Sequence, residues 1–203
     1  MKSVVFTIGH SNHEIGSLIA LLRQHDITAI GDIRSHPYSR YVPQYSREPL
    51  KAALASAGIS YVFLGRELGA RSVNPTCYKQ GRVQYEKLAM EPIFLEGIAR
   101  VIQGVKRYRI ALMCAEKDPI ECHRSLLVGR KLYDVGIHAN HILADGSLES
   151  HEVLESRLLA LCKLPEGDMF KSRDEFVAEA YLIQGGRVAY RDEEMAKEER
   201  VSV

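Results

Sequence analysis

The sequence lacks three features that would each assign the chain to a particular class of protein. No apolar run approaches the roughly 20 residues that a membrane-spanning helix needs. The apolar run over residues 4–8 is too short for the core of a signal peptide, and no small-residue cleavage site follows it. The four cysteines form no Cys-x-x-Cys pair and no disulfide framework. These absences predict a cytoplasmic protein with no membrane partner.

The chain also lacks an excess of charge of either sign. Its 27 basic and 26 acidic residues leave a net charge of +1. This balance argues against a general nucleic-acid coat, because non-specific phosphate binding needs clustered lysine and arginine. It remains compatible with a local basic pocket. With 46% apolar residues in a chain of 203, the composition is that of a globular protein with one sizeable core.

Short apolar runs alternate with helical patterns along most of the chain. This alternation implies right-handed βαβ crossovers and an α/β fold with three layers, in which helices cover both faces of a mainly parallel sheet of about five strands. The predicted strands are residues 4–9, 28–33, 59–64, 109–114 and 138–143. The predicted helices are residues 15–25, 47–57, 83–90, 92–106, 120–134, 149–162 and 173–184, and residues 65–81 are expected to be irregular.

The only candidate boundary is the segment 165–168, which contains a proline and a glycine. It divides an α/β domain, residues 1–163, from a helical and charged C-terminal appendage, residues 164–203. The appendage is too short for a core of its own. We therefore expect the functional site in the first of the two parts.

Reactive and charged side chains follow four of the five predicted strands. In open parallel sheets, ligands bind outside the carboxyl ends of the strands. Because Asp32 and Arg34 alternate, both can serve one site only if their strand ends near Ile33. The basic segment over 66–82 is expected to be a solvated face, or alternatively a lid over an anionic substrate. The residues at the predicted strand ends are His10, Ser11, Asp32, Arg34, Arg40, Glu67, Cys114 and Glu116.

The segment from Cys114 to Arg124 is the most informative part of the chain. Asp118 and Pro119 predict the start of a helix, which would place Cys122, His123 and Arg124 in its first turns. Thiolates are stabilised near a helix amino terminus beside a cation, and the same amides bind anions. The plainer alternatives are that Cys114 is a buried core residue, His10 a structural histidine and Asp32 an acceptor for loop amides.

The chain contains four motifs: Thr7-Ile8-Gly9-His10-Ser11, Asp32-Ile33-Arg34 with Pro37, Ser39 and Arg40, Glu67-Leu68-Gly69, and Cys114-x-Glu116 with Cys122-His123-Arg124. In this order they resemble the motifs of an uncharacterised bacterial and archaeal family, domain of unknown function four hundred and eighty-eight. The resemblance covers roughly residues 4–150. It implies a Rossmann-like α/β fold and a Cys/His/Arg site, and it supplies no reaction. One departure is Ala70, where a second glycine is expected after Gly69.

Three functions are compatible with these residues. The first is a thiol-dependent transferase or hydrolase that acts on a phosphate-bearing small molecule, a nucleotide or a nucleic acid. Cys122 or Cys114 would be its nucleophile, with His10 or His123 as base and Glu116 in the same catalytic group. The arginines suit phosphate, because guanidinium groups bind it bidentately. The substrate-binding residues would be Ser11, Asp32, Arg34, Arg40, Glu67 and Arg124.

No familiar signature identifies the reaction. The chain has neither a P-loop nor a Gly-x-Gly-x-x-Gly fingerprint after a strand, and its Cys-to-Arg spacings are not those of a tyrosine-phosphatase loop. The second function is a non-catalytic module that binds an anionic ligand or nucleic acid.

The third function is a zinc or iron metalloenzyme, for which Cys114, Cys122, His123 and His10 offer mixed sulfur and nitrogen ligands, with Glu116 as base. Against the metalloenzyme, Cys122 and His123 would be adjacent on a helix and about 100° apart. The sequence therefore favours the thiol-dependent enzyme, assigns no metal ligands, and leaves the cofactor and the oligomeric state open.

Overall fold

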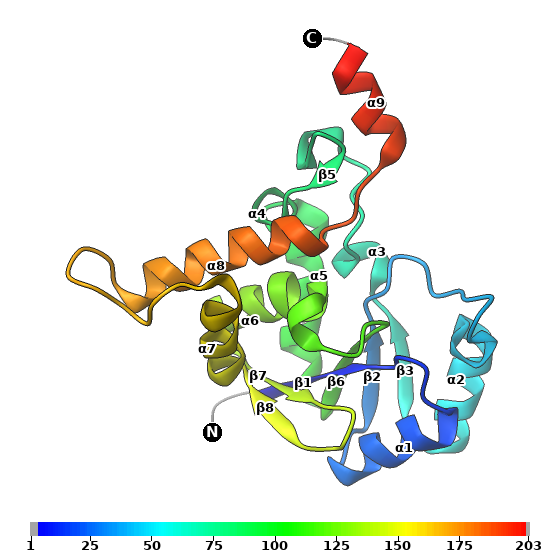
Figure 1. Cartoon of the computed structure of the whole chain (residues 1–203). Coiled ribbons are helices and arrows are strands. Elements are labelled where there is room, and N and C mark those ends of the chain that lie inside the picture. The colour runs from blue at the N-terminus through cyan, green and yellow to red at the C-terminus, as the bar shows by residue number, and fades with distance from the viewer. Residues whose placement is uncertain (1–3, 202–203) are drawn as a thin grey trace.

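A six-stranded sheet with the order β3-β2-β6-β1-β7-β8 forms the centre of the computed structural model, which describes residues 4–201, with side chains for residues 4–197 (Figure 1). The first five strands in this order are parallel, and β8 pairs antiparallel with β7. The predicted α/β class and mainly parallel sheet are confirmed. The strands are β1 Val4–Gly9, β2 Ala29–Asp32, β3 Ser60–Phe63, β6 Ile110–Cys114, β7 His138–Ile142 and β8 Leu148–Ser150.

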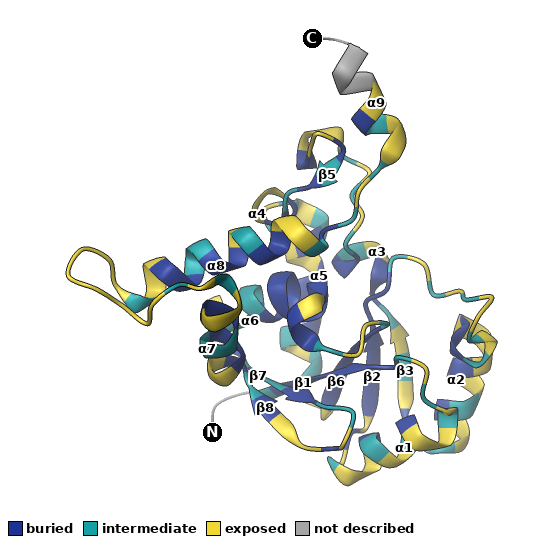
Figure 2. Cartoon of the chain, viewed as in Figure 1, coloured by how far each residue is buried: buried dark blue, intermediate teal, exposed yellow. Residues whose placement is uncertain are grey.

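Helices cover both faces of this sheet, and buried residues fill the space between the layers (Figure 2). Because side chains alternate along a strand, β6 divides its residues between two apolar clusters. Ala111 and Met113 join the cluster under α1 and α2, whereas Leu112 and Cys114 join the cluster under α5, α6 and α7. These helices are α1 Ile15–Gln24, α2 Arg47–Ser56, α5 Pro92–Gly104, α6 Arg130–Asp134 and α7 His151–Cys162.

The C-terminal part of the chain continues this second cluster. Helix α8, Arg173–Val188, packs against α7 and buries Phe176, Ala180 and Tyr181. It crosses the molecule above α6 and α7 in Figure 1, and α9, Glu193–Val201, follows it. The side chains of α8 and the residues before position 163 therefore share one core.

The connection between β3 and α5 is more ordered than expected. It contains α3, Gly65–Leu68, the strand pair β4, Tyr78–Lys79, and β5, Arg82–Val83, and a short helix α4, Tyr85–Leu88. Two residues with positive φ, Gln80 and Gly81, form the turn of the hairpin. The prediction of an irregular segment over 65–81 is correct for residues 69–74 and wrong for residues 65–68 and 75–79, because elements of two to four residues show no periodicity.

The helix predicted over 120–134 is also wrong in its first part. Pro119–Glu121 forms a single 3-10 turn, capped by Asp118, whose carboxylate accepts a hydrogen bond from the Ile120 N–H at 3.0 Å. Cys122 then has an extended backbone, with φ −138° and ψ 143°. A π-helix over Arg124–Gly129 leads into α6. Residues 149–150 form β8 and not the first turn of a helix.

Candidate functional site

The segments that leave β1 and β6 run side by side beyond the sheet. Gly9 and Cys114 are in register at the ends of these strands, and the N–H of His10 donates a hydrogen bond to the carbonyl of Cys114 at 2.9 Å. The N–H of Ser11 donates to the carbonyl of Ala115 at 2.8 Å. The two segments therefore bring the predicted residues of both strand ends to one edge of the sheet.

Four of the predicted residues converge there, and we call Cys114, Glu116, Cys122 and His123 the rim cluster. The Sγ atoms of Cys114 and Cys122 each lie 2.9 Å from Oε2 of Glu116. Nδ1 of His123 lies 3.5 Å from Sγ of Cys114 and 3.9 Å from Sγ of Cys122. All four potential ligand atoms lie within 4.8 Å of one another. Three of these residues are buried and Glu116 is exposed.

The ring of His123 is oriented by a backbone contact. Its Nε2 lies 3.1 Å from the carbonyl oxygen of Ile33, which can only accept a hydrogen bond. Nε2 therefore carries a proton, and in the neutral ring Nδ1 presents a lone pair to the two sulfur atoms. Metal-binding histidines are commonly oriented in this way, through a carbonyl on the second ring nitrogen.

The rim cluster also shifts the proton equilibria of its members. Desolvation of its carboxylate beside the two buried thiols raises the pKa of Glu116, although the residue as a whole is exposed, and burial raises the pKa of Cys114 well above its ordinary value. Burial also opposes a thiolate at Cys122, but the contact with Cys114 and the charges of Arg124 and His123 outweigh it, so the pKa of Cys122 is lowered well below its ordinary value. Burial opposes the charged form of His123, but the contact with Cys122 outweighs burial and raises the pKa of His123.

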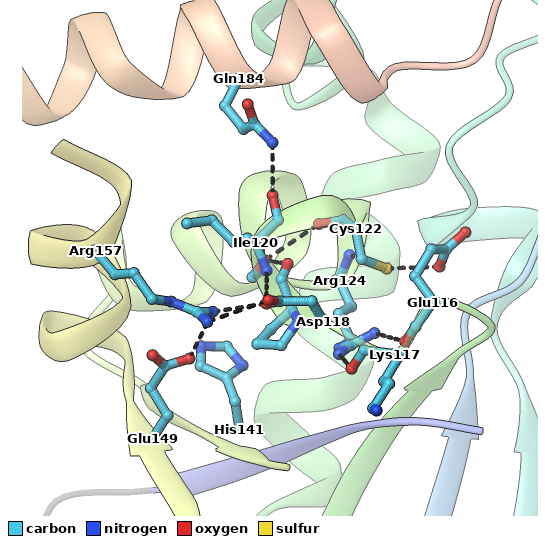
Figure 3. A network of polar contacts seen from close by, with 12 residues as sticks. Glu116, Lys117, Asp118, Ile120, Cys122, Arg124, His141, Glu149, Arg157 and Gln184 are labelled. Carbon is cyan, nitrogen blue, oxygen red and sulfur yellow. Dashed lines mark hydrogen bonds and ion pairs between the residues drawn. The ribbon is translucent and has the colours of Figure 1, made fainter. Parts of the chain in front are cut away.

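Arg124 fixes the backbone that carries Glu116 (Figure 3). Its side chain is fully buried, and its Nη1 and Nη2 donate to the carbonyls of Glu116 and Lys117 at 2.5 and 3.0 Å. This backbone also passes so close to Gly9 that an added Cβ would meet the Glu116 carbonyl oxygen at 1.8 Å. Arg124 thus binds its own chain, and sequence reasoning had placed it against a substrate.

The turn before Cys122 is attached to two further helices (Figure 3). Arg157 of α7 donates to Asp118, with Nη2 at 2.6 Å from Oδ1, and the same Nη2 lies 3.1 Å from Oε2 of Glu149. Gln184 of α8 donates from Nε2 to the carbonyl of Ile120 at 3.1 Å. These contacts fix the turn between Glu116 and Cys122 from the side of the C-terminal helices.

His10 has both of its ring nitrogens occupied within the protein. Nδ1 donates to the carbonyl of Ser11 at 2.8 Å, and Nε2 accepts from Nη1 of Arg34 at 3.2 Å. The ring stacks on Tyr45 with 4.1 Å between centroids. Mainly because of burial, the pKa of His10 falls to about 4. The structure therefore places His10 as a neutral acceptor beside Arg34.

A pocket of about 300 Å³ opens beside the rim cluster. Cys114, Glu116 and His123 line it, whereas Cys122 does not. Arg34 and two residues that the sequence did not single out, Arg71 and Tyr190, line other parts of its wall. A basic loop was the only sequence signal for Arg71, and no local pattern pointed to Tyr190, which follows α8.

Of the six predicted substrate-binding residues, Arg34 lines this pocket, whereas Ser11, Asp32, Arg40, Glu67 and Arg124 do not. Arg40 is exposed, and Glu67 pairs with Arg100 of α5. The hydroxyl of Ser11 donates to the side chain of Asn12. The structure thus brings Cys114, Glu116, Cys122 and His123 together, places Asp32, Arg34 and His10 beside them, and separates Ser11, Arg40 and Glu67 from the pocket.

Within residues 4–201, no helix has the length and apolar character needed to cross a bilayer.

Comparisons with known proteins give one match. Neither the comparison with curated proteins nor that with solved structures found a match. The model of one family matches residues 14–130, a segment that contains all the motifs named above except the one around Gly9. Because this match covers more than half of the 203 residues, the chain belongs to the family described as Domain of unknown function DUF488.

Proposed function

We propose that the chain is a metal-dependent hydrolase in which Cys114, Cys122 and His123 bind a zinc or iron ion. The convergence of their ligand atoms carries this proposal. Around a tetrahedral zinc ion, typical bond lengths place a sulfur and a nitrogen ligand about 3.6 Å apart. The observed separations from Nδ1 of His123 are 3.5 and 3.9 Å.

The objection to a metal site depended on a helix that is not present. Cys122 is extended and His123 begins the next helical segment, so the two side chains reach the same space even though they are adjacent in sequence. Oε2 of Glu116 contacts both thiols, and a divalent ion would take the place of the protons that these contacts require. Zinc and iron both accept such mixed sulfur and nitrogen ligands.

Glu116 is the exposed member of the rim cluster, and it lies where the site meets the pocket. A zinc or iron ion held by these residues would supply an activated water molecule. Glu116 would be the general base and general acid beside it, holding at its carboxylate the proton that passes from the water to the leaving group. A pocket of about 300 Å³ suits a small-molecule substrate.

Metal analysis of the purified full-length protein tests this function. We expect about one zinc or iron ion per chain in the wild type, and its loss in Cys122→Ser and His123→Gln. Cys77→Ser is the matched control, because Cys77 is also buried but lies outside the rim cluster. A wild-type protein that binds neither ion, even when titrated with it, contradicts the proposal.

The thiol-dependent transferase or hydrolase is the second candidate. The backbone N–H of Arg124 donates to Sγ of Cys122 at 3.4 Å, and Nδ1 of His123 lies 3.9 Å from the same sulfur. Such contacts stabilise a thiolate. Site-resolved alkylation distinguishes the two candidates. Rapid modification of Cys122 in metal-free protein that remains active under chelation would favour the thiol enzyme over the metalloenzyme.

A further inference from the structure

Arg71 lies on the pocket wall and stacks on an aromatic side chain. Its guanidinium carbon is 4.1 Å from the centroid of the Tyr190 ring, and both side chains line the pocket. The loop that carries Arg71 depends on Gly69, because a Cβ there would lie 2.5 Å from Oγ of Ser35. Gly69 therefore packs closely against the segment that leaves β2.

Tyr190 is fixed by the hairpin of β4 and β5. Its carbonyl accepts a hydrogen bond from the N–H of Val83 at 3.0 Å, and the N–H of Asp192 donates to the carbonyl of Gly81 at 2.7 Å. Two hydrogen bonds therefore attach the segment after α8 to the β4-β5 hairpin. The ring of Tyr190 gives the guanidinium of Arg71 a fixed platform through a cation–π contact.

The two arginines of the pocket differ in how their charge is compensated. Arg34 is paired with Asp32 at 2.7 Å. Arg71 is exposed, and among the residues whose side chains are described no carboxylate lies within 4.0 Å of its guanidinium group. The guanidinium group has five N–H donors in a planar fork that matches an oxyanion. The pocket also contains the carboxylate of Glu121, which opposes anion binding.

We propose that Arg71, supported by the Tyr190 ring, binds a phosphate group of the substrate. The substrate of the hydrolase proposed above would then be an anionic small molecule, and the C-terminal segment would form part of its binding site. The statement that the bound molecule is the substrate of a hydrolase rests on the proposed function. The contact between Arg71 and the anion is independent of that function, because it involves neither the Cys114 thiol nor the Cys122 thiol.

Calorimetric titration of the full-length protein with inorganic phosphate tests this contact. We expect Arg71→Gln to weaken binding at least about tenfold, because it removes charge-assisted hydrogen bonds. Tyr190→Leu should also weaken binding, whereas Tyr190→Phe keeps the aromatic face and should bind as the wild type does. Glu121→Gln should strengthen binding, because it removes a negative charge from the same pocket. Arg66→Gln, an exposed arginine of α3 outside the pocket, is the matched control.

Weaker phosphate binding in Arg71→Gln together with stronger phosphate binding in Glu121→Gln would show that the contact is electrostatic, because a structural effect would not change the affinity in opposite directions. Equal affinity in the wild type and Arg71→Gln, or no binding by the wild type at millimolar phosphate, overturns the proposal. Titration of Cys114→Ser distinguishes it from the proposed function. Phosphate binding that is lost in Cys114→Ser and retained in Arg71→Gln would assign the anion to the metal and refute the role of Arg71, while the metal site would stand.

Discussion

Arg34 folds back onto Asp32, the residue two positions before it. Nε of Arg34 donates to Oδ1 of Asp32 at 2.9 Å, and Nη2 donates to Oδ2 at 2.7 Å. Oδ2 also accepts from the hydroxyl of Tyr61 at 2.8 Å, and the Asp32 side chain is fully buried. The ion pair is possible because β2 ends at Asp32, so Arg34 is free to leave the alternation of the strand.

Asp32→Asn should destabilise the protein by about 3–5 kcal/mol, because it leaves the buried charge of Arg34 without a partner. Urea unfolding at pH 7 measures this change. Glu48→Gln is the control: its pair with Arg47 is 3.9 Å long and exposed, so we expect a change of less than about 1 kcal/mol. Similar losses of unfolding free energy in the two variants would show that the buried pair contributes no more to stability than the exposed pair does.

Gly9→Ala should disrupt the rim cluster, because the added Cβ would displace the backbone of Glu116. We expect loss of the bound metal together with reduced stability, measured by metal analysis and by urea unfolding. Gly16→Ala is the matched control. A Cβ at Gly16 in α1 meets nothing within 4 Å, and alanine should stabilise this helix by up to about 1 kcal/mol. Retained metal in Gly9→Ala would contradict the predicted displacement.

Arg124→Lys should lower metal affinity by about 10- to 100-fold, the range typical for residues that orient metal ligands. An ammonium group is a point donor and cannot reproduce the two guanidinium contacts to the carbonyls of Glu116 and Lys117. Competition with a chelator measures the affinity, and circular dichroism establishes that the fold is retained. Arg130→Lys, in the adjoining α6, should leave the affinity unchanged. An equal loss in both variants would argue against a specific role for Arg124.

His151 makes stability depend on pH. It is fully buried, Nδ1 lies 3.2 Å from Nε2 of His141, and Nε2 lies 2.9 Å from the hydroxyl of Tyr181. The ring of Tyr133 is 5.4 Å away between centroids. Burial is the main reason that the pKa of His151 falls to about 4, with the charge of Arg130 acting in the same direction.

The unfolded chain therefore binds a proton at His151 more readily than the folded chain does. The contribution of His151 to stability is present above about pH 6.5 and is lost as the pH falls toward 4. Urea unfolding of the wild type should give a free energy about 2 kcal/mol lower at pH 5 than at pH 7 from this group alone. His151→Gln cannot titrate, so its pH dependence should be weaker by that amount. An unchanged pH dependence would be inconsistent with a neutral, buried His151.

The sequence was sufficient for the parts of the fold that follow from periodicity. Short apolar runs between helical patterns located the five parallel strands to within one residue at each end, and the shared edge of parallel strands explains why Cys114 and Glu116 were expected near Asp32 and Arg34. Short elements were missed because a strand of three residues such as β8, or a single 3-10 turn, contains too few residues to show a period.

The sequence by itself determined the fold class and the edge of the sheet at which reactive side chains gather, because both depend on local patterns of apolar residues. Only the tertiary structure decided what these side chains do. An extended Cys122 between a 3-10 turn and a π-helix brings two adjacent residues to one point, and buried Arg124 turns toward its own backbone. Arg71 meets Tyr190 because the β4-β5 hairpin binds the segment after α8. Such contacts arise from packing between distant segments, which leaves no period in the sequence.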